Sequence, residues 1–257
     1  MTPATKYSIK LRRKIIELQH RFYERKCLQR LKLNEGFWST LTEYLQLSKS
    51  TGCEYSDYWI LYNYVRQNKP KQILECGTGV STIVMAYALM ENEKQGNPRG
   101  HITSMEDIKE WYDHASKLMP LPLQRYVDIT YSERTEYYYR IFRGVGYRDI
   151  PNREYEFVFV DGPQVRNPSD GEESFDFDYI NIVMRSDIPV FGVVDQRVGT
   201  CYVLQKIFGT NKVKYDPMLA LGFLGPCTKK DLSFKLGSKA FRPCIRVFGK
   251  TELNLHR

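Results

Sequence analysis

Apolar residues near the start of the chain recur every three or four positions, which is the spacing of one face of a helix. Ile15, Leu18 and Phe22 form this stripe, and Leu31 continues it. The pattern predicts a helix over residues 6–33.

Two shorter helices are expected to follow. The first covers residues 34–52 and ends at Gly52, and the second covers residues 56–69. Ser56 is the expected N-cap of the second helix, because a serine hydroxyl can accept a hydrogen bond from a free amide of the first turn. Pro70 sets its end, because the residue before a proline is disfavoured in helical conformation.

From residue 71 onward, short apolar runs alternate with segments of helical periodicity. Strands are expected over residues 71–76, 100–107, 126–132, 155–163 and 188–196. Helices are expected between and after them, over residues 80–96, 108–119, 134–146, 177–187 and 199–209. Two further strands are expected over residues 212–216 and 243–250, and the last of them should return antiparallel.

This alternation predicts an α/β fold with a Rossmann-like open sheet, mostly parallel with an antiparallel last strand and helices on both faces. The length of 257 residues suits one large domain with an appendage. We expect residues 1–55 to form an N-terminal helical extension and residues 56–257 to form the Rossmann-like domain. The extension is expected either to cap an acceptor site or to form an oligomer interface, such as that of a homodimer.

Composition places the chain among soluble globular proteins, with 42% hydrophobic and 26% charged residues. No apolar run approaches the ~18 residues of a membrane span, and the N-terminus does not resemble a secretory signal, so a cytoplasmic location is expected. The six cysteines form no CxxC pair, which favours buried free thiols over a zinc ribbon. Cys227 and Cys244 are the one pair that might meet across a hairpin.

Positive charge is concentrated in the first part of the chain. Residues 1–70 contain 13 Lys and Arg against six Asp and Glu, a net charge of +7, whereas the remaining 187 residues carry +1. A solvated helix face is the simplest interpretation, and a patch for nucleic acid or an anionic membrane is the alternative.

The stretch ILECGTGVST, residues 73–82, places a glycine turn between a strand and a helix. Gly77 and Gly79 would let the backbone approach a ligand closely, and the helix start offers free amides. A dinucleotide fingerprint, G-x-G-x-x-G, would need a third glycine where this chain has Thr82. Glu75 is expected to face the ligand, and a carboxylate there would repel a pyrophosphate. The turn therefore favours a ligand that carries a positive group.

This stretch resembles the first motif of class I S-adenosylmethionine-dependent methyltransferases, a hydrophobic strand followed by E/D-x-G-x-G. The resemblance implies that Glu106, at the end of the second strand, binds the ribose hydroxyls of the cofactor, with Asp107 as the second candidate. It also implies an adenine contact after the third strand, where Ser132 lies, and a methyl-transfer site beside Asp161 in VFVDGP.

The chemistry of S-adenosylmethionine agrees with these assignments. The cofactor carries a sulfonium, an ammonium and a carboxylate but no phosphate, so its site needs acids for the ribose and the ammonium and backbone donors for the carboxylate. Glu75 and Glu106 would supply the acids. The turn would supply the donors, through Gly77, Thr78, Gly79 and Ser81.

Transfer to a hydroxyl also requires removal of a proton by a general base or a metal ion. Asp161 and Asp195, after the fourth and fifth strands, are the candidate catalytic residues. They resemble the aspartates of catechol O-methyltransferase-like enzymes, which hold Mg²⁺ with an Asp-Asn pair after the fifth strand. Gln196 stands here in place of the asparagine. Two interpretations stay open: a metal site of Asp161, Asp195 and Gln196, or a role for Asp195 as the N-cap of the next helix.

Other polar and aromatic residues suggest weaker hypotheses. Arg166, in the loop after the fourth strand, would grip an acidic or polar acceptor or simply be solvated. Residues 137–139, three consecutive tyrosines, would line an acceptor pocket or pack in the core. His101 and His114 show no partner in the sequence, and we assign them no catalytic role.

The sequence thus favours an S-adenosylmethionine-dependent enzyme that methylates oxygen of a small or sugar-like acceptor by direct displacement. The alternatives are an NAD-dependent oxidoreductase and a non-catalytic binding protein of the same fold that contacts nucleic acid through its basic N-terminal segment.

Overall fold

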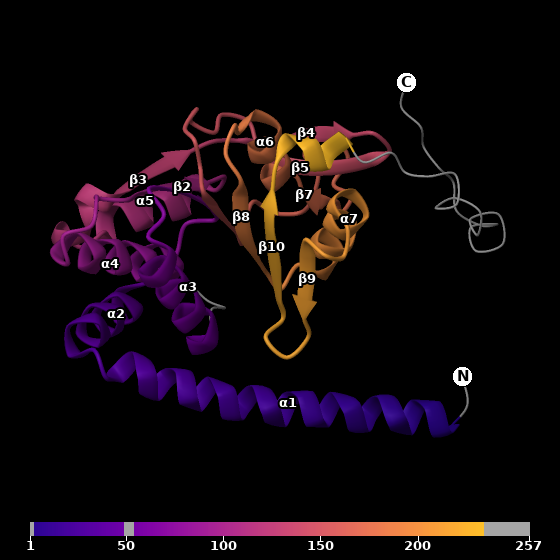
Figure 1. Cartoon of the computed structure of the whole chain (residues 1–257), viewed down its shortest axis with the longest axis horizontal. Coiled ribbons are helices and arrows are strands. Elements are labelled where there is room, and N and C mark those ends of the chain that lie inside the picture. Colours follow the sequence, from indigo (N-terminus) through magenta and orange to yellow (C-terminus); the bar gives the residue numbers. More distant parts are fainter. Residues whose placement is uncertain (1–2, 49–53, 234–257) are drawn as a thin grey trace.

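The computed structural model describes residues 3–48 and 54–233. Three helices come first, namely α1 (Pro3–Lys32), α2 (Glu35–Leu47) and α3 (Tyr55–Asn68). Figure 1 shows α1 as a long helix along one edge of the molecule, with α2 and α3 leading back to the body. The expected end of the second helix at Gly52 lies outside the described residues.

The N-terminus of α3 differs from the sequence prediction. Glu54 is the N-cap, and its backbone amide donates to the Asp57 carboxylate over 3.1 Å. Ser56 is buried inside the first turn, so its assignment as the cap was wrong. Glu24 of α1 accepts the amides of Tyr55 and Ser56 at 2.6 and 2.7 Å, and α1 thereby satisfies the free donors of α3.

A seven-stranded sheet forms the centre of the fold, in the order β3-β2-β1-β6-β8-β10-β9. β3, β2, β1, β6 and β8 are parallel, while β10 runs antiparallel to β8 and to β9. The strands are β1 (Gln72–Cys76), β2 (His101–Glu106), β3 (Val127–Tyr131), β6 (Phe157–Val160), β8 (Val190–Asp195), β9 (Val213–Asp216) and β10 (Leu221–Cys227).

Most of the sheet agrees with the sequence prediction, and the open, mostly parallel Rossmann-like architecture is confirmed. The antiparallel strand is β10, which sequence patterning missed because two glycines and a proline interrupt its apolar residues. The strand expected over residues 243–250 lies outside the described residues, as does Cys244. Cys27, Cys76, Cys201 and Cys227 are buried free thiols, as expected.

Helices cover both faces of the sheet (Figure 1). One core joins α2, α3 and the nearly wholly buried α4 (Val80–Lys94), and the other lies under α6 (Asp178–Arg185) and α7 (Val198–Phe208). α5 (Lys109–Leu118) packs beside β2 and β3, and two 3₁₀ turns, η1 (Leu121–Tyr126) and η2 (Lys229–Ser233), complete the described chain.

Residues 134–146 form a β-hairpin, and the helix predicted there was wrong. β4 (Arg134–Tyr139) pairs antiparallel with β5 (Phe142–Tyr147), and β5 also pairs with β7 (Phe175–Asp176). Aromatic residues favour strands, and this run packs on one face, where Tyr137 stacks on Phe177 at 5.2 Å. Glycine at position 146 also lets β5 pack close to Asp178, because a Cβ there would lie 2.4 Å from Asp178 Oδ1.

None of the helices in the described part of the chain combines the length and the apolar character that crossing a membrane requires. The arrangement that matters for function is the reversal of strand order at β1, which has β2 on one side and β6 on the other. Ligands of open α/β sheets bind beyond the carboxyl ends of the strands at such a reversal.

Candidate active site

Two cavities lie side by side at the carboxyl ends of the parallel strands and share part of their walls. The small cavity, of about 270 Å³, is bounded by the ends of β1, β2 and β6, and the large cavity, of about 600 Å³, by the ends of β6 and β8. Asp161, Gln164 and Arg197 line both. The remaining residues of the small cavity are Gly77, Thr78, Glu106, Asp107, Ile108, Trp111, Gly162 and Pro163, and those of the large cavity are Val165, Arg166, Asp195 and Gln196.

The glycine turn after β1 packs directly against the loop after β6. Gly77 has φ +98°, and a Cβ on it would lie 3.0 Å from the Asp161 carbonyl carbon and the Gly162 nitrogen. A Cβ on Gly162 would lie 2.8 Å from the Gly77 backbone. Both positions therefore need glycine, one for its left-handed backbone and both for the close approach. This contact holds Asp161 beside the turn.

Glu75 does not face either cavity. Its carboxylate is fully buried behind the first turn of α4 and accepts hydrogen bonds from the hydroxyls of Ser81, Thr82 and Ser104 over 2.6, 2.5 and 2.6 Å. Burial raises its pKa to about 7, although the three hydroxyls oppose that shift. The expectation that Glu75 faces the ligand was therefore wrong. The Glu75 carboxylate lies inside the protein, where its hydrogen bonds hold the start of α4.

Most amides of the turn already have partners inside the protein. Gly77 donates to the Met105 carbonyl over 3.0 Å, Thr78 to Glu106 over 3.3 Å, and Gly79 to the Thr82 hydroxyl over 3.1 Å. Ser81 is buried and bound to Glu75. Of the predicted turn residues, only Gly77 and Thr78 line the small cavity in the described part of the chain.

Glu106 lies where the sequence predicted, at the end of β2 and in the wall of the small cavity. Its carboxylate accepts backbone amides, among them that of Ile108 on one oxygen over 2.9 Å and that of Thr78 on the other over 3.3 Å. Burial raises its pKa to about 7. Asp107 lines the same cavity, and the Arg134 guanidinium lies 3.7 Å from the Asp107 carboxylate. Since each carboxylate oxygen has two lone pairs, Glu106 retains acceptor capacity toward the cavity.

Ser132 is not part of either cavity wall. It is buried, its hydroxyl accepts the Asp149 amide over 3.0 Å, and its role therefore lies in holding the chain after β3. The apolar wall of the small cavity comes instead from Ile108 and Trp111 of the β2–α5 segment. An aromatic residue five positions after the acid of β2 was the sequence signal that could have indicated this wall.

Asp161 and Asp195 meet at the large cavity, as the sequence predicted. Burial, and next the charge of Asp161, raise the pKa of Asp195 to about 8, and burial raises the pKa of Asp161 to about 6. Asp195 is 3% exposed, and its Oδ1 has no hydrogen-bond partner among the described residues. A buried carboxylate oxygen without a hydrogen-bond partner is stabilised by a proton or by a bound cation.

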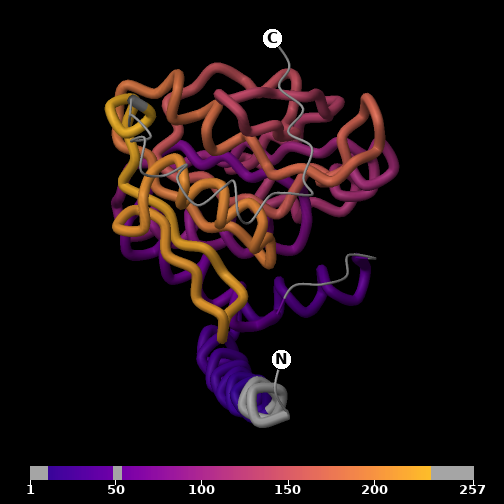
Figure 2. The backbone as a smooth tube through the Cα atoms, turned by 90° about the vertical axis from the view of Figure 1, so that its right-hand side faces the viewer, coloured from indigo at the N-terminus to yellow at the C-terminus, as the bar shows by residue number. Residues whose placement is uncertain are grey.

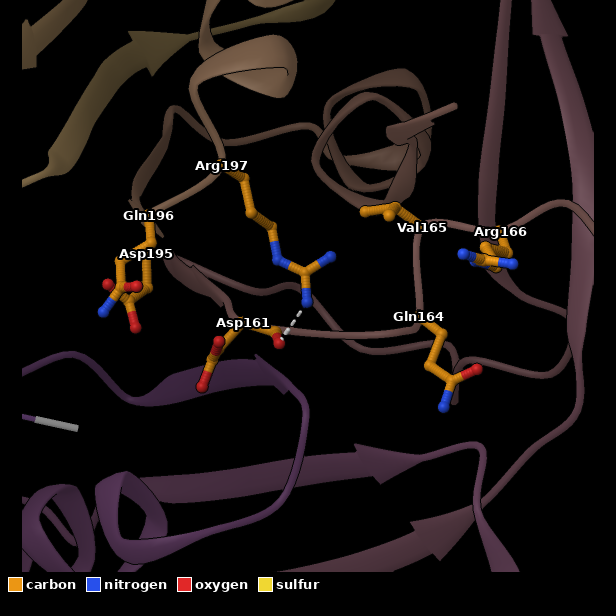
Figure 3. A pocket seen from close by; sticks show the side chains of 7 residues that line it. All are labelled: Asp161, Gln164, Val165, Arg166, Asp195, Gln196 and Arg197. Atoms are coloured by element: carbon orange, nitrogen blue, oxygen red, sulfur yellow. Dashed lines mark hydrogen bonds between the residues drawn. The ribbon is translucent and has the colours of Figure 1, made fainter. Parts of the chain in front are cut away.

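Gln196 follows Asp195 in a left-handed conformation, with φ +51°, and its amide donates to the Ala220 carbonyl over 2.9 Å. In Figure 3 the side chains of Asp161, Asp195 and Gln196 extend in the same direction. Three oxygen-bearing side chains of this kind match the donor types that Mg²⁺ prefers, and the unpartnered Asp195 oxygen is consistent with such an ion. The helix-capping alternative for Asp195 does not apply, because α7 starts after Arg197.

Arg197 is the residue of this site that sequence reasoning missed. Its guanidinium donates to the main-chain oxygens of Asp161 and Pro163 and to the buried Asp176 carboxylate, the last over 2.7 Å (Figure 3). The cation lies between the ends of β6 and β8 and lowers the pKa values of Asp161 and Asp195 against the effect of burial. No periodic pattern marks such a residue, because its partners are main-chain atoms of another loop.

Arg166 lines the large cavity and remains a candidate contact for an acceptor. The three tyrosines of β4 line neither cavity among the described residues, and Tyr137 donates to the Tyr147 carbonyl over 2.9 Å, so packing explains that residue. His101 pairs with Asp128 over 2.9 Å, away from both cavities.

The described lining of the two cavities includes no residue of the segment 1–55. The segment has an electrostatic link to the site, because the charge of Glu54 contributes to the raised pKa of Asp195. His20, Glu24 and Glu54 form the one group of three His, Cys, Asp or Glu side chains within the described ranges that is close enough for a shared metal ion. Their contacts are accounted for by the capping of α3 and a His20–Glu54 pair of 2.6 Å.

No protein-family model matches the sequence, and a comparison with curated proteins finds no match. Among solved structures, a putative caffeoyl-CoA O-methyltransferase from Staphylococcus aureus aligns with a TM-score of 0.52 and 13% identity, over 79% of this chain and all of the other. The O-methyltransferase TomG from Streptomyces achromogenes, in complex with S-adenosylmethionine, aligns with a TM-score of 0.42 and 19% identity, over 61% of this chain and 64% of TomG.

An O-methyltransferase from Bacillus cereus, in complex with S-adenosylhomocysteine, gives a TM-score of 0.42 and 19% identity, over 61% of this chain and 66% of the other. The chain thus spans slightly less than two thirds of the length of these last two proteins. At such identities a structural similarity concerns the fold alone, and the TM-score of 0.52 for the Staphylococcus aureus protein supports a shared fold. This chain therefore shares with that protein the open, mostly parallel Rossmann-like fold that its sequence predicted.

Proposed function

We propose that this protein is an S-adenosylmethionine-dependent methyltransferase that acts on an oxygen atom of a small, polar acceptor. One observation carries the proposal: the small cavity, whose wall includes the Glu106 carboxylate, and the large cavity share Asp161, Gln164 and Arg197 in their walls. A donor nucleoside and an acceptor bound in the two cavities would therefore meet beside a carboxylate. Holding two reactants together in this way supplies much of the acceleration of a direct displacement.

The small cavity has the properties that an adenosine group requires. Glu106 can accept hydrogen bonds from both ribose hydroxyls, and Ile108 and Trp111 offer apolar surface to a purine. Gly77 and Thr78 of the glycine turn complete the wall on the side of β1. When bound, S-adenosylmethionine supplies a methyl group on a positively charged sulfur. The carboxylates of Glu106, Asp107 and Asp161 favour that charge.

The large cavity has the properties of an acceptor site. Gln164, Arg166 and Gln196 provide polar groups that suit a hydroxyl-rich or sugar-like molecule. Asp161, with a pKa of about 6, is ionised at neutral pH and would take the proton of the acceptor hydroxyl, whereas Asp195, with a pKa of about 8, would serve as the base in more alkaline solution. Arg197 would hold the two loops, and with them the two carboxylates, in position.

A divalent cation is the second way in which this site would activate the acceptor hydroxyl, in place of a carboxylate base. Asp161, Asp195 and Gln196 would hold Mg²⁺, which when bound lowers the pKa of an acceptor hydroxyl. Charge supports this assignment, because three carboxylates (Asp161, Asp176 and Asp195) surround one guanidinium, that of Arg197. The longer side chain of Gln196, compared with asparagine, is the feature that speaks against the ion.

A thermal-shift and calorimetric comparison tests the proposal. S-Adenosylmethionine and S-adenosylhomocysteine are expected to raise the midpoint of unfolding, and NAD is not, because only a ligand of the native state stabilises it. Glu106→Gln should weaken the binding of S-adenosylhomocysteine by about 1–3 kcal/mol, the scale of a lost charge-assisted hydrogen bond. Glu110→Gln, an exposed position on α5, is the matched control and should bind normally.

Each alternative function has its own outcome in this experiment. Stabilisation by NAD and not by S-adenosylhomocysteine would favour an oxidoreductase. The turn itself speaks against that function, because the third glycine of the dinucleotide fingerprint is replaced by Thr82, which donates a hydrogen bond to Glu75. Equal binding of S-adenosylhomocysteine by the Glu106→Gln variant and the wild type would show that the nucleoside is not held where we propose.

A further inference from the structure

Helix α1 extends beyond the body of the molecule and carries an apolar stripe that nothing in the described structure covers. Near its C-terminal end, Cys27 and Leu31 are buried. Closer to the N-terminus, four large apolar side chains are exposed to solvent. They are Leu11, Ile15, Leu18 and Phe22, which are 51%, 46%, 64% and 73% exposed.

The stripe lies on the side of α1 that faces away from the protein. Since successive residues of a helix are rotated by about 100°, the four exposed side chains fall within roughly 60° of one another, and Cys27 and Leu31 lie on the opposite side. Glu24 is also on that opposite side, where it accepts two amides of α3. Figures 1 and 2 agree that α1 lies along an outer edge, with the rest of the described chain on one side of it.

Basic residues border the stripe on both sides. By the same rotation, Arg12 and Lys26 lie on one flank, and Lys14, Arg21 and Arg25 lie on the other. All of α1 contains ten Lys and Arg against two Glu, a net charge of +8. This equals the net charge of the whole chain, so the remaining residues together carry none.

We propose that this outer face of α1 binds the headgroup region of an anionic membrane. Helices that lie in a membrane interface combine a narrow row of Leu, Ile and Phe with Lys and Arg on the flanks. The apolar row enters the boundary between headgroups and acyl chains, while the long basic side chains reach the phosphates. Helix α1 lies at the edge of the molecule (Figures 1 and 2), and its four side chains from Leu11 to Phe22 are exposed, so we expect the row to reach a flat surface.

The charges argue against the other occupants of this face. In a pair of α1 helices joined along the stripe, the flanks would place Lys and Arg of one copy against Lys and Arg of the other, and like charges there are repulsive. A nucleic acid would satisfy the basic flanks but would leave the four apolar side chains without an apolar partner. An anionic bilayer satisfies both groups.

Flotation of the full chain with lipid vesicles tests this proposal. The protein is expected to float with vesicles of phosphatidylcholine mixed with phosphatidylserine, and much less with phosphatidylcholine alone. Salt should weaken the binding without abolishing it, because the apolar contribution remains. Exchange of Arg12, Lys14 and Lys26 for Gln should reduce partitioning about fivefold per residue.

Apolar substitutions provide the sharper comparison. The double change Leu18→Asp and Phe22→Asp should reduce partitioning at least about 100-fold, because two buried apolar side chains are lost. Leu121→Asp, at an 81% exposed leucine in η1, is the matched control and should float like the wild type. All these positions are at the surface, so circular dichroism should show a folded protein in each case.

Three results would overturn the proposal. One is equal flotation of the Leu18→Asp/Phe22→Asp variant and the wild type. Another is a dimer in solution that this variant converts to monomers, with no vesicle binding, which would assign the stripe to a second copy. The third is salt-sensitive binding of DNA or RNA that the double change leaves intact, again with no vesicle binding.

Discussion

Asp195 combines burial with an unpartnered oxygen, so its ionised form is costly to the folded protein. Its pKa of about 8 lies well above the value of ~3.9 for an exposed aspartate. The folded protein therefore keeps a proton that the unfolded chain releases as the pH rises above about 4. The contribution of this group to stability is present below that pH and is lost as the pH rises toward about 8.

Asp195→Asn should therefore stabilise the protein in alkaline solution. We expect the free energy of unfolding at about pH 8 to rise on the order of 2 kcal/mol, with little change at about pH 4. Urea unfolding across this range measures the difference. Asp113→Asn, an exposed position paired with Lys109, is the control and should be neutral.

The same variant tests the metal proposal. Mg²⁺ should raise the unfolding midpoint of the wild type more at about pH 8 than at about pH 6, because metal and proton compete for the same carboxylates. Asp195→Asn should lose most of that response. An unchanged response would assign the ion to another part of the protein.

Two loops, those after β6 and β8, form one unit through Arg197. Its guanidinium binds two carbonyls of the first loop and the carboxylate of Asp176, which is fully buried. Burial alone raises the pKa of Asp176, and Arg197 is the main opposing charge. The arrangement explains how the ends of two neighbouring strands keep Asp161 and Asp195 in place.

Arg197→Gln should cost about 3–5 kcal/mol of stability, because a buried carboxylate loses its partner. The double variant Arg197→Gln/Asp176→Asn should recover part of that loss, since the unpaired charge is then gone. Urea unfolding of the two variants measures the recovery. A double variant that is less stable than Arg197→Gln would show that the ion pair is not the origin of the cost.

The contact between the β1 and β6 loops provides a second test at the level of elements. Gly162→Ala should destabilise by roughly 1–3 kcal/mol, because its Cβ would lie 2.8 Å from the Gly77 backbone. Gly199→Ala, in α7 with nothing within 4 Å of the new Cβ, should be neutral or slightly stabilising. Thermal unfolding of the two variants gives the comparison, and equal midpoints would contradict the close approach.

The sequence predicted elements where one signal dominates. Residues 157–160 are a continuous apolar run, which predicts a buried strand, and all four are buried in β6. The strands β1, β2, β3, β8 and β9 were also predicted, from short apolar segments between helices and turns. The hairpin of residues 134–147 was not predicted, because a tyrosine-rich run suits either a helix or a strand. The contact of Tyr137 with Phe177, distant in sequence, favours the strand. β10 was missed because glycine and proline weaken a strand pattern that pairing with β8 restores.

The whole molecule divides into a nearly neutral α/β body and a basic helix. The order of strands and turns in the sequence predicted four polar residues at one edge of the sheet, and the structure places them there. They are Glu106, Asp161, Asp195 and Gln196. Side-chain direction was not predictable, since Glu75 precedes the turn yet its carboxylate lies beneath it, bound by three hydroxyls.

The central claim is that the two adjacent cavities hold a nucleoside donor and its acceptor on either side of Asp161. A crystal structure of the full chain with S-adenosylhomocysteine tests it most directly. We predict ribose hydroxyls within hydrogen-bonding distance of the Glu106 carboxylate, the base against Trp111, and the sulfur directed toward Asp161 and the large cavity. A nucleoside bound elsewhere, or a sulfur directed away from the large cavity, would contradict the account.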